Sequence, residues 1–250
     1  MYQQVVDALY NRFKDKLYEH FKPISIANMY DDPLDKEVAI MLLFCVDENF
    51  IEAPSNLSIS LTNILSRVPY GKNREWIGSP EYKKSFAGVN TLKDRLFKVR
   101  INRVFEPLER LHYVYSRFYS IRDYMLSQRP KEPQQALFDL FDKKGDYRSD
   151  FATNMVYNIL TRDADSFGLG LIRGLTEPKD LYIPVNKTIA LNSRNFELLP
   201  NVKVRVDNAS EYLKRSLMEY DPNDPSKYIP ILLIHNMKAT LSKMGYIISR

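Results

Sequence analysis

Four residues in one short polar stretch have the types and spacing of a phosphate-binding turn. Lys143, Lys144 and Gly145 follow one predicted helix, and Arg148 precedes the next. A short polar turn between two helices presents backbone N–H groups, and the positive end of the second helix, to a phosphate. The pattern therefore predicts contacts with nucleic-acid phosphates. An ordinary connection between two helices is the alternative interpretation.

A second basic region lies between Lys93 and Arg122. It holds eight basic residues against three acidic ones, and four aromatic residues lie together at residues 113–119. This pattern is typical of a surface that follows a phosphate backbone and stacks on bases. A solvated helix face over a buried aromatic stripe explains it equally well. The basic residues are Lys93, Arg95, Lys98, Arg100, Arg103, Arg110, Arg117 and Arg122, and the aromatic residues are Tyr113, Tyr115, Phe118 and Tyr119.

Metal and cofactor chemistry have little support in the sequence. His20, His112 and His235 are far apart in the chain and none has a second ligand at helical spacing, so no metal site is expected. The single cysteine, Cys45, excludes an internal disulfide and a cysteine-based metal cluster. The glycines of residues 168–174 are spaced almost as in a dinucleotide-binding loop, but the third is one position late and no strand precedes them. No cofactor is therefore predicted.

The elements that must position these residues are predicted to be helices. Glycine accounts for only 8 of 250 residues, which disfavours turn-rich β folds. Residues 38–46 are apolar on nearly all sides, as in a helix buried at the centre of a domain. The stretch 91–128 is predicted to hold two helices that are bent or broken near Pro107. Apolar residues spaced three or four apart predict the other helices, at residues 2–21, 36–50, 57–68, 134–141, 150–160, 187–195, 208–220 and 228–244.

Composition and charge indicate a globular chain. Hydrophobic residues make up 44% and charged residues 27%, and the net charge of +5 permits nucleic-acid binding without establishing it. The longest apolar run, nine residues, is far shorter than the roughly 20 that span a bilayer. The first residues lack the pattern of a signal peptide. We therefore expect a cytoplasmic protein with no membrane association.

Three separated stretches of the chain share one resemblance. They are Pro23-Ile-Ser-Ile26 with Asp35-Lys-Glu-Val-Ala-Ile40, then Asn154-Met-Val-Tyr-Asn-Ile-Leu-Thr-Arg162 with Phe167-Gly-Leu-Gly170 and Leu181-Tyr-Ile-Pro184, and finally Tyr220-Asp-Pro-Asn-Asp-Pro-Ser-Lys-Tyr228. In order and spacing these stretches cover nearly the whole chain. The set is similar to an uncharacterised prokaryotic family that is distantly related to helix-hairpin-helix DNA glycosylases.

The resemblance implies an all-α, helix-hairpin-helix DNA glycosylase-like fold with a DNA groove between two helical lobes. Residues 1–250 would form a single unit, with one lobe built from residues 1–22 and 134–250 and the other from residues 23–133. Double-stranded DNA is the implied partner, while protein partners are not indicated. The DNA-binding residues are then expected to be Lys143, Lys144, Gly145, Arg148, Arg162 and Lys187.

The catalytic positions depart from that family. In such enzymes an Asp at the start of a helix stabilises positive charge on the sugar, and bifunctional members add a Lys that attacks the sugar carbon. Here Asn186 stands at the Asp position, and the Lys position falls in the apolar start of Phe151-Ala-Thr-Asn154. Asn caps a helix as well as Asp does, but it cannot carry negative charge or accept a proton. The substitutes that the sequence offers are Lys144, Lys179 or Lys187 as nucleophile and Asp150, Asp163 or Asp180 as acid.

Three hypotheses follow. The first is a DNA-binding protein of glycosylase-like fold without standard base-excision chemistry, because Asn186 lacks the carboxylate. The second is an active glycosylase or lyase on damaged purines that uses a non-standard catalytic pair. The third is a helical protein-interaction module whose basic residues are merely solvated.

Overall fold

The chain folds into helices joined by turns and loops. The computed structural model describes residues 6–12, 14, 22–46, 65–87, 95–163, 167–200 and 206–234, and these contain no strand, which confirms the all-α prediction for this part of the chain. Residues 6–12 are helical. The other elements are α2 (Lys22–Ala27), α3 (Pro33–Val46), α5 (Asn73–Ile77), α6 (Glu81–Ala87), α7 (Arg95–Arg117), α8 (Ile121–Ser127), α9 (Pro133–Leu140), α10 (Phe151–Thr161), η3 (Pro178–Asp180), α11 (Lys187–Asn195), α12 (Val206–Met218), η4 (Pro225–Tyr228) and α13 (Ile229–Leu232).

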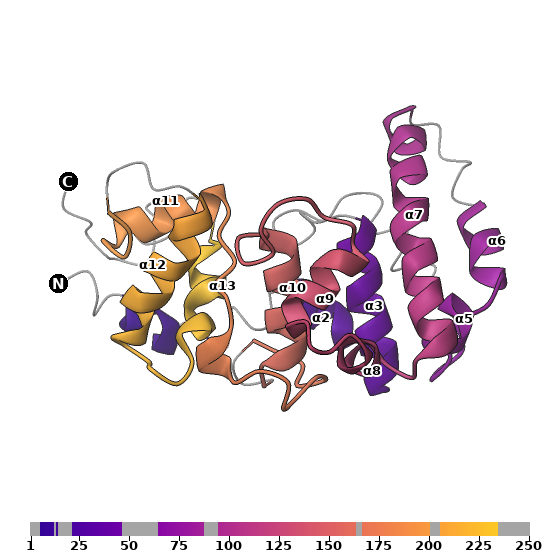
Figure 1. Ribbon diagram of the computed structural model, residues 1–250, viewed down its shortest axis with the longest axis horizontal. Helices are drawn as coiled ribbons and strands as arrows, with labels where there is room; N and C mark the ends of the chain where they lie inside the picture. The colour runs from indigo at the N-terminus through magenta and orange to yellow at the C-terminus, as the bar shows by residue number, and fades with distance from the viewer. Residues whose placement is uncertain are drawn as a thin grey trace.

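The helices follow one another along the long axis of the molecule. Helices α5, α6 and α7 lie at one end in Figure 1, α3, α8, α9 and α10 lie in the middle, and α11, α12 and α13 lie at the other end. Residues 38–44 of α3 are all buried, as the apolar run predicts, and α3 contacts α2, α5, α7 and α10. The buried apolar residues form one continuous cluster from Val6 to Leu233. The division into two lobes therefore stays a prediction.

Both ends of the described chain meet beside η4. The ring of Tyr10 lies 5.4 Å from the ring of Tyr228, and the Tyr228 hydroxyl donates to Asp7 at 2.9 Å. In Figure 1 the indigo N-terminal helix lies among the orange and yellow helices α11, α12 and α13. The helix at residues 6–12 is therefore part of the C-terminal group of helices.

Most predicted helices are confirmed within a few residues, and the stretch 91–128 does hold two helices, but the break between them does not lie at Pro107. Helix α7 runs through Pro107 without ending, although a proline removes one backbone hydrogen bond and crowds the preceding turn. Beyond Pro107 the side chains of Leu108, Leu111 and Val114 are fully buried, and α7 packs against α3 and α5, which offsets that cost. The helix ends at Arg117, where Ser120 begins α8 by accepting a hydrogen bond from the Asp123 N–H. Most of the predicted helices 57–68 and 228–244 lies outside the described residues.

Glu37 on α3 is a buried carboxylate that fixes the start of α8. Its Oε1 accepts hydrogen bonds from the Ile121 N–H at 2.7 Å and from the Tyr115 hydroxyl at 3.0 Å. Burial raises the pKa of Glu37 from 4.5 to about 7, although these two hydrogen bonds act in the opposite direction. Glu37 therefore ties the centre of the molecule to the α7–α8 junction at the expense of burying an ionisable group.

The raised pKa of Glu37 predicts a pH-dependent stability. Between pH 4.5 and about 7 the folded chain holds a proton on Glu37 that the unfolded chain releases, so the free energy of unfolding falls as pH rises. The slope from this group is at most about 1.4 kcal/mol per pH unit. Glu37→Gln should remove this slope in urea unfolding measured across that range. Glu75→Gln, at an exposed position on α5, is the matched control, and an unchanged slope in Glu37→Gln would contradict the prediction.

Candidate nucleic-acid interface

The turn between α9 and α10 carries the predicted phosphate-binding residues. Its backbone reverses at Asp142 and Gly145, which have φ values of 52° and 111°. Gly145 contributes conformation, because residues with a side chain rarely adopt such a φ. Lys144 and Arg148 are exposed, whereas Lys143 is half-buried and its N–H donates to the Phe138 carbonyl at the end of α9. The turn therefore presents two long cationic side chains to solvent.

Hydrogen bonds fix the backbone of this turn to α10. The side chain of Asn154, itself fully buried, donates to the carbonyl oxygens of Tyr147 and Arg148, both at 3.0 Å. Asp146 accepts from the Arg148 N–H at 3.0 Å, and Asp150 caps α10 by accepting from the Thr153 N–H at 2.8 Å. The side chains of Asn154, Asp146 and Asp150 thus hold the segment 146–150 in one conformation.

The Arg148 side chain lies against an aromatic ring. Its Nε donates to the Tyr147 hydroxyl at 3.3 Å, and its guanidinium carbon is 5.4 Å from the centre of the Tyr147 ring. The hydrogen bond to Tyr147 keeps the pKa of Arg148 above its ordinary value, so the group stays charged at any physiological pH. The ring of Tyr147 in turn meets the ring of Tyr182 edge to face, with 5.9 Å between centres.

A cavity of about 650 Å³ opens beside this turn. Its walls come from the turn, from the segment that contains Tyr182, and from one face of α12. Lys214 lies in this wall with its Nζ 5.9 Å from the centre of the Tyr182 ring, and burial lowers the pKa of Lys214. Burial also raises the pKa of Tyr182 to about 12. The lining residues are Asp146, Arg148, Tyr182, Asn208, Ser210, Glu211, Lys214, Arg215 and Met218.

Sequence analysis did not single out Lys214 or Tyr182. The sequence does indicate one wall of the cavity. Asn208, Glu211 and Met218 are three or seven residues apart, which places them on one face of the predicted helix 208–220. That spacing predicts one surface face of a helix. The spacing does not indicate that this helix face packs beside a turn some 65 residues earlier in the chain.

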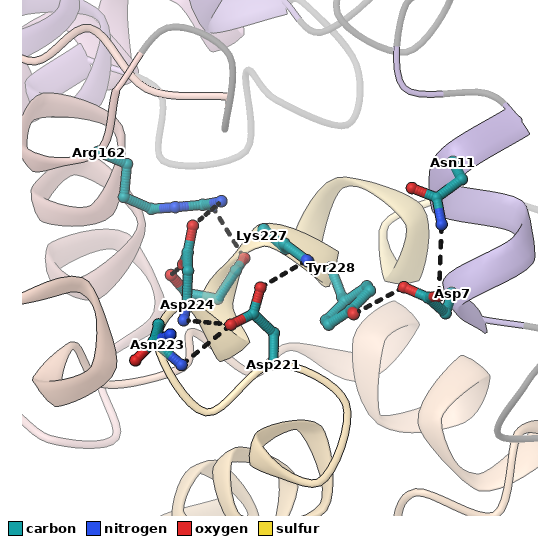
Figure 2. Close-up of polar contacts among 9 residues, drawn as sticks. Asp7, Asn11, Arg162, Asp221, Asn223, Asp224, Lys227 and Tyr228 are labelled. Carbon is teal, nitrogen blue, oxygen red and sulfur yellow. Dashed lines mark hydrogen bonds and ion pairs between the residues drawn. The ribbon is translucent and has the colours of Figure 1, made fainter.

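Arg162 has to be removed from the predicted DNA-binding set. Its side chain is 3% exposed, and the guanidinium donates to the Ser226 carbonyl at 2.9 Å and pairs with Asp224 at 3.1 Å (Figure 2). A phosphate backbone outside the protein cannot reach a guanidinium that is enclosed in this way. The prediction that Arg162 contacts DNA is therefore wrong. Its guanidinium is buried in an ion pair with Asp224, which lies 62 residues away in the sequence.

The stretch 220–228, which carries part of the family resemblance, is held by its own polar contacts (Figure 2). Asp221 accepts from the N–H groups of Asn223 and Asp224 at 2.9 and 3.0 Å, and it pairs with the Lys227 ammonium at 2.6 Å. Tyr228 extends this network to Asp7 on the N-terminal helix. These residues bind the ends of the chain to α10, and the role that the contacts define for them is structural.

Asn186 caps α11, as its residue type predicts. Its side-chain oxygen accepts a hydrogen bond from the Ile189 N–H at 2.9 Å, and Lys187 is the exposed first residue of the helix. None of Asn186, Lys187 and Lys144 belongs to the lining of the cavity beside the turn. The geometry therefore does not bring the three predicted catalytic positions into that cavity.

The other predicted substitutes are dispersed. Asp150 is used as the cap of α10, and Asp163 pairs with Arg173 at 2.6 Å. Lys179 and Asp180 lie exposed on η3 and do not line the cavity beside the turn. No described contact joins one of the proposed lysines to one of the proposed acids.

The second basic region is largely engaged within the protein where its side chains are described. Arg110 pairs with Glu106 at 2.8 Å and with Asp142 at 3.1 Å, and Arg117 lies 4.0 Å from the ring centre of Tyr113. Tyr115 is buried, whereas Tyr113 and Tyr119 are exposed. Lys93 lies outside the described residues, as do the side chains of Arg95, Lys98, Arg100 and Arg103. Among the described side chains, carboxylates therefore offset the charge of Arg110 but not that of Arg117, whose contact is an aromatic ring.

Glycines 168 and 170 close a loop over the end of α10. The N–H groups of Leu169, Gly170 and Leu171 donate to the carbonyls of Ile159, Arg162 and Leu160 at 2.7, 2.7 and 2.8 Å. A Cβ on Gly168 would lie 1.8 Å from the Arg162 carbonyl oxygen, so the close approach of the two backbones requires glycine. The loop therefore satisfies terminal carbonyls of a helix.

Gly168→Ala is expected to destabilise the chain by about 1–3 kcal/mol, because the backbone of Arg162 must move. Urea unfolding followed by circular dichroism measures the loss. Gly71→Ala is the comparison for strain without a clash, because its φ of 69° disfavours a side chain although a Cβ would meet nothing within 4 Å, whereas Gly168 has no positive φ. Equal losses in the two variants would contradict the steric explanation.

Metal and membrane contacts find no support in the described residues. His112 bonds through Nδ1 to the Ile77 carbonyl at 2.9 Å and stacks on Tyr82, and His20 and His235 lie outside the described residues. No group of three potential metal ligands occurs in the part of the chain that the structure describes. Within the same ranges, no helix combines the length and apolar character needed to cross a bilayer.

Comparisons of the chain with protein families, curated proteins and solved structures give no match. What defines the protein is its structure, which in the described residues is all-α, with Lys144 and Arg148 exposed on the turn beside the cavity.

Proposed function

We propose that the chain binds double-stranded DNA through the turn between α9 and α10. The observation that carries this proposal is the outward position of Lys144 and Arg148 on a backbone that the buried Asn154 fixes. Cations on a rigid turn bind phosphates at a smaller loss of conformational entropy than cations on a mobile loop. Lys187, exposed at the first residue of α11, is a further cation of the proposal.

The acidic residues of the turn keep their negative charge but are engaged with other groups of the protein. Asp142 pairs with Arg110, Asp146 accepts the Arg148 N–H, and Asp150 caps α10. Each carboxylate is directed to a group of the protein, whereas Lys144 and Arg148 extend into solvent. A glycosylase-like fold with its groove at this turn remains part of the proposal, since the resemblance supports it.

The proposal includes the loss of standard base-excision chemistry. Asn186 caps α11 but holds no negative charge, so it cannot stabilise a cationic sugar as an Asp does. The protein would then recognise DNA without cleaving the bond between base and sugar.

Fluorescence anisotropy with an undamaged duplex and an 8-oxoguanine duplex tests this function. We expect binding that weakens steeply as salt rises from about 0.05 to about 0.2 M, with equal affinity for the two duplexes. Absence of binding at low salt would overturn the proposal and favour the protein-interaction module.

A second candidate function, a lyase that acts on damaged DNA, is favoured by Lys214. This amine lies in the wall of the cavity, and burial lowers its pKa, which increases the fraction of the neutral, nucleophilic form. Its Nζ would add to the aldehyde carbon of an abasic sugar, and loss of water would give an imine. Borohydride reduces that imine to a stable amine, so a covalent complex that disappears in Lys214→Arg would support the lyase. No trapping on an abasic duplex would exclude Lys214 as nucleophile.

A further inference from the structure

The cavity beside the turn has the size of a small-molecule site and is open to solvent, since Arg148, Asn208 and Glu211 in its lining are exposed. Its volume of about 650 Å³ lies within the range of ligand pockets, roughly 300–1,000 Å³. The Ser210 hydroxyl, itself buried, donates to the Ile183 carbonyl at 2.7 Å and so joins α12 to the segment that contains Tyr182. Asn154 fixes the opposing turn. The cavity is therefore formed before any ligand enters.

Two cations of different elements contribute to the walls. Arg148 comes from the turn and Lys214 from α12, and in the described residues neither has a carboxylate oxygen within 4 Å. The third cation, Arg215, forms an ion pair with Glu211 one helical turn earlier. Half-burial disfavours the charged form of Lys214, a cost that an anion within the cavity would offset. Asp146 and Glu211 also line the cavity, and the charges of Asp180 and Glu211 act against the lowering of the Lys214 pKa. An anion is therefore favoured where Arg148 and Lys214 face it, and not beside these carboxylates.

An aromatic ring lies next to this cationic pair. Tyr182 lines the cavity, with the Lys214 ammonium 5.9 Å from its ring centre and the Tyr147 ring against its edge. Asn208 adds an amide to the lining. A flat heterocycle with hydrogen-bonding groups suits a tyrosine ring and an amide.

We infer that this cavity binds the terminal phosphomonoester of a nucleotide between Arg148 and Lys214, with the base against Tyr182. A phosphomonoester carries nearly two negative charges at neutral pH, which matches two cations. A phosphodiester within a strand carries one charge, and its chain would have to leave the cavity on both sides. The nucleotide is either free or the 5′ end of a DNA strand, and the second source rests on the proposed function.

Anisotropy with matched duplexes tests the DNA end. Two short duplexes carry fluorescein at the 3′ end and differ only in a 5′-phosphate or a 5′-hydroxyl. We expect the wild-type chain to prefer the 5′-phosphate by about tenfold, since its hydrogen bonds would be made to charged groups. Lys214→Gln and Arg148→Gln should abolish the preference. Lys84→Gln, which removes the same charge on α6 at the far end of the molecule (Figure 1), should retain it.

Calorimetry with adenosine 5′-monophosphate and with adenosine tests the free nucleotide. If the chain binds the monophosphate but not adenosine, and Lys214→Gln loses this binding, the result supports the cavity as the site. If the two duplexes are then bound equally, the ligand is a free nucleotide. No preference between the duplexes together with no binding of the monophosphate overturns the inference. In that case salt-dependent binding of the 5′-hydroxyl duplex would still support the proposed function, so the two can fail separately. A preference that survives in both pocket variants would also overturn the inference.

Discussion

Arg162→Ala is expected to lower the free energy of unfolding by about 3–5 kcal/mol, the usual cost of leaving one member of a buried ion pair without its partner. The guanidinium is 3% exposed and joins α10 to Asp224 and to the Ser226 carbonyl (Figure 2). Its loss leaves the 16% exposed Asp224 carboxylate without its cation, whereas the Ser226 carbonyl keeps one donor, the Ile229 N–H. Urea unfolding followed by circular dichroism measures this loss.

Arg173→Ala is the matched control, because Arg173 pairs with Asp163 at the surface, with both side chains more than half exposed. Exposed pairs contribute about 0–1 kcal/mol. A loss in Arg162→Ala no larger than in Arg173→Ala would contradict the structural role of Arg162. At a temperature where both variants are folded, their affinities for DNA should be equal, since Arg162 does not reach the surface.

The helices could be predicted because their signals are local. The spacing of apolar residues and the caps Asp150 and Asn186 lie within one or two turns of the helices that they define, and α10, α11 and α12 appear within two residues of the predicted bounds. The break predicted at Pro107 does not occur because packing, which is not local, decides the outcome there. The local cost of the proline is real, but the packing of α7 on α3 and α5 outweighs it, and such packing depends on residues far away in the sequence.

The candidate site could be predicted only in part for the same reason. The turn 143–149 is a local pattern, and the structure places Lys144 and Arg148 at the surface and Lys143 half-buried, while their contact with phosphates stays a prediction. Arg162 has the residue type of a phosphate contact, yet Asp224 decides its role from 62 residues away. Lys214 and Tyr182 meet because α12 packs beside the turn, so their shared cavity has no signature in either segment alone.

Removing the two exposed cations of the turn is expected to weaken DNA binding strongly. The double variant Lys144→Ala with Arg148→Ala should lose roughly 10- to 100-fold in affinity at about 0.1 M salt, because with two phosphate contacts fewer the binding releases fewer counterions. The slope of log K against log salt should become shallower by about 1.8. Gly145 and Asn154 remain in place, so the conformation of the turn is preserved. Anisotropy titrations at several salt concentrations measure both quantities.

The control removes an equal charge elsewhere. Lys84 and Arg67 are exposed, one on α6 and the other shortly before α5, and both lie in the part of the chain that packs at the opposite end from α12 (Figure 1). If the whole charge of the molecule attracted DNA, Lys84→Ala with Arg67→Ala would weaken binding as much as the turn variant. A local contact predicts that this control keeps the wild-type slope, since counterions are released only where phosphates are bound. Equal slopes in the wild-type chain and the turn variant would remove the turn from the interface.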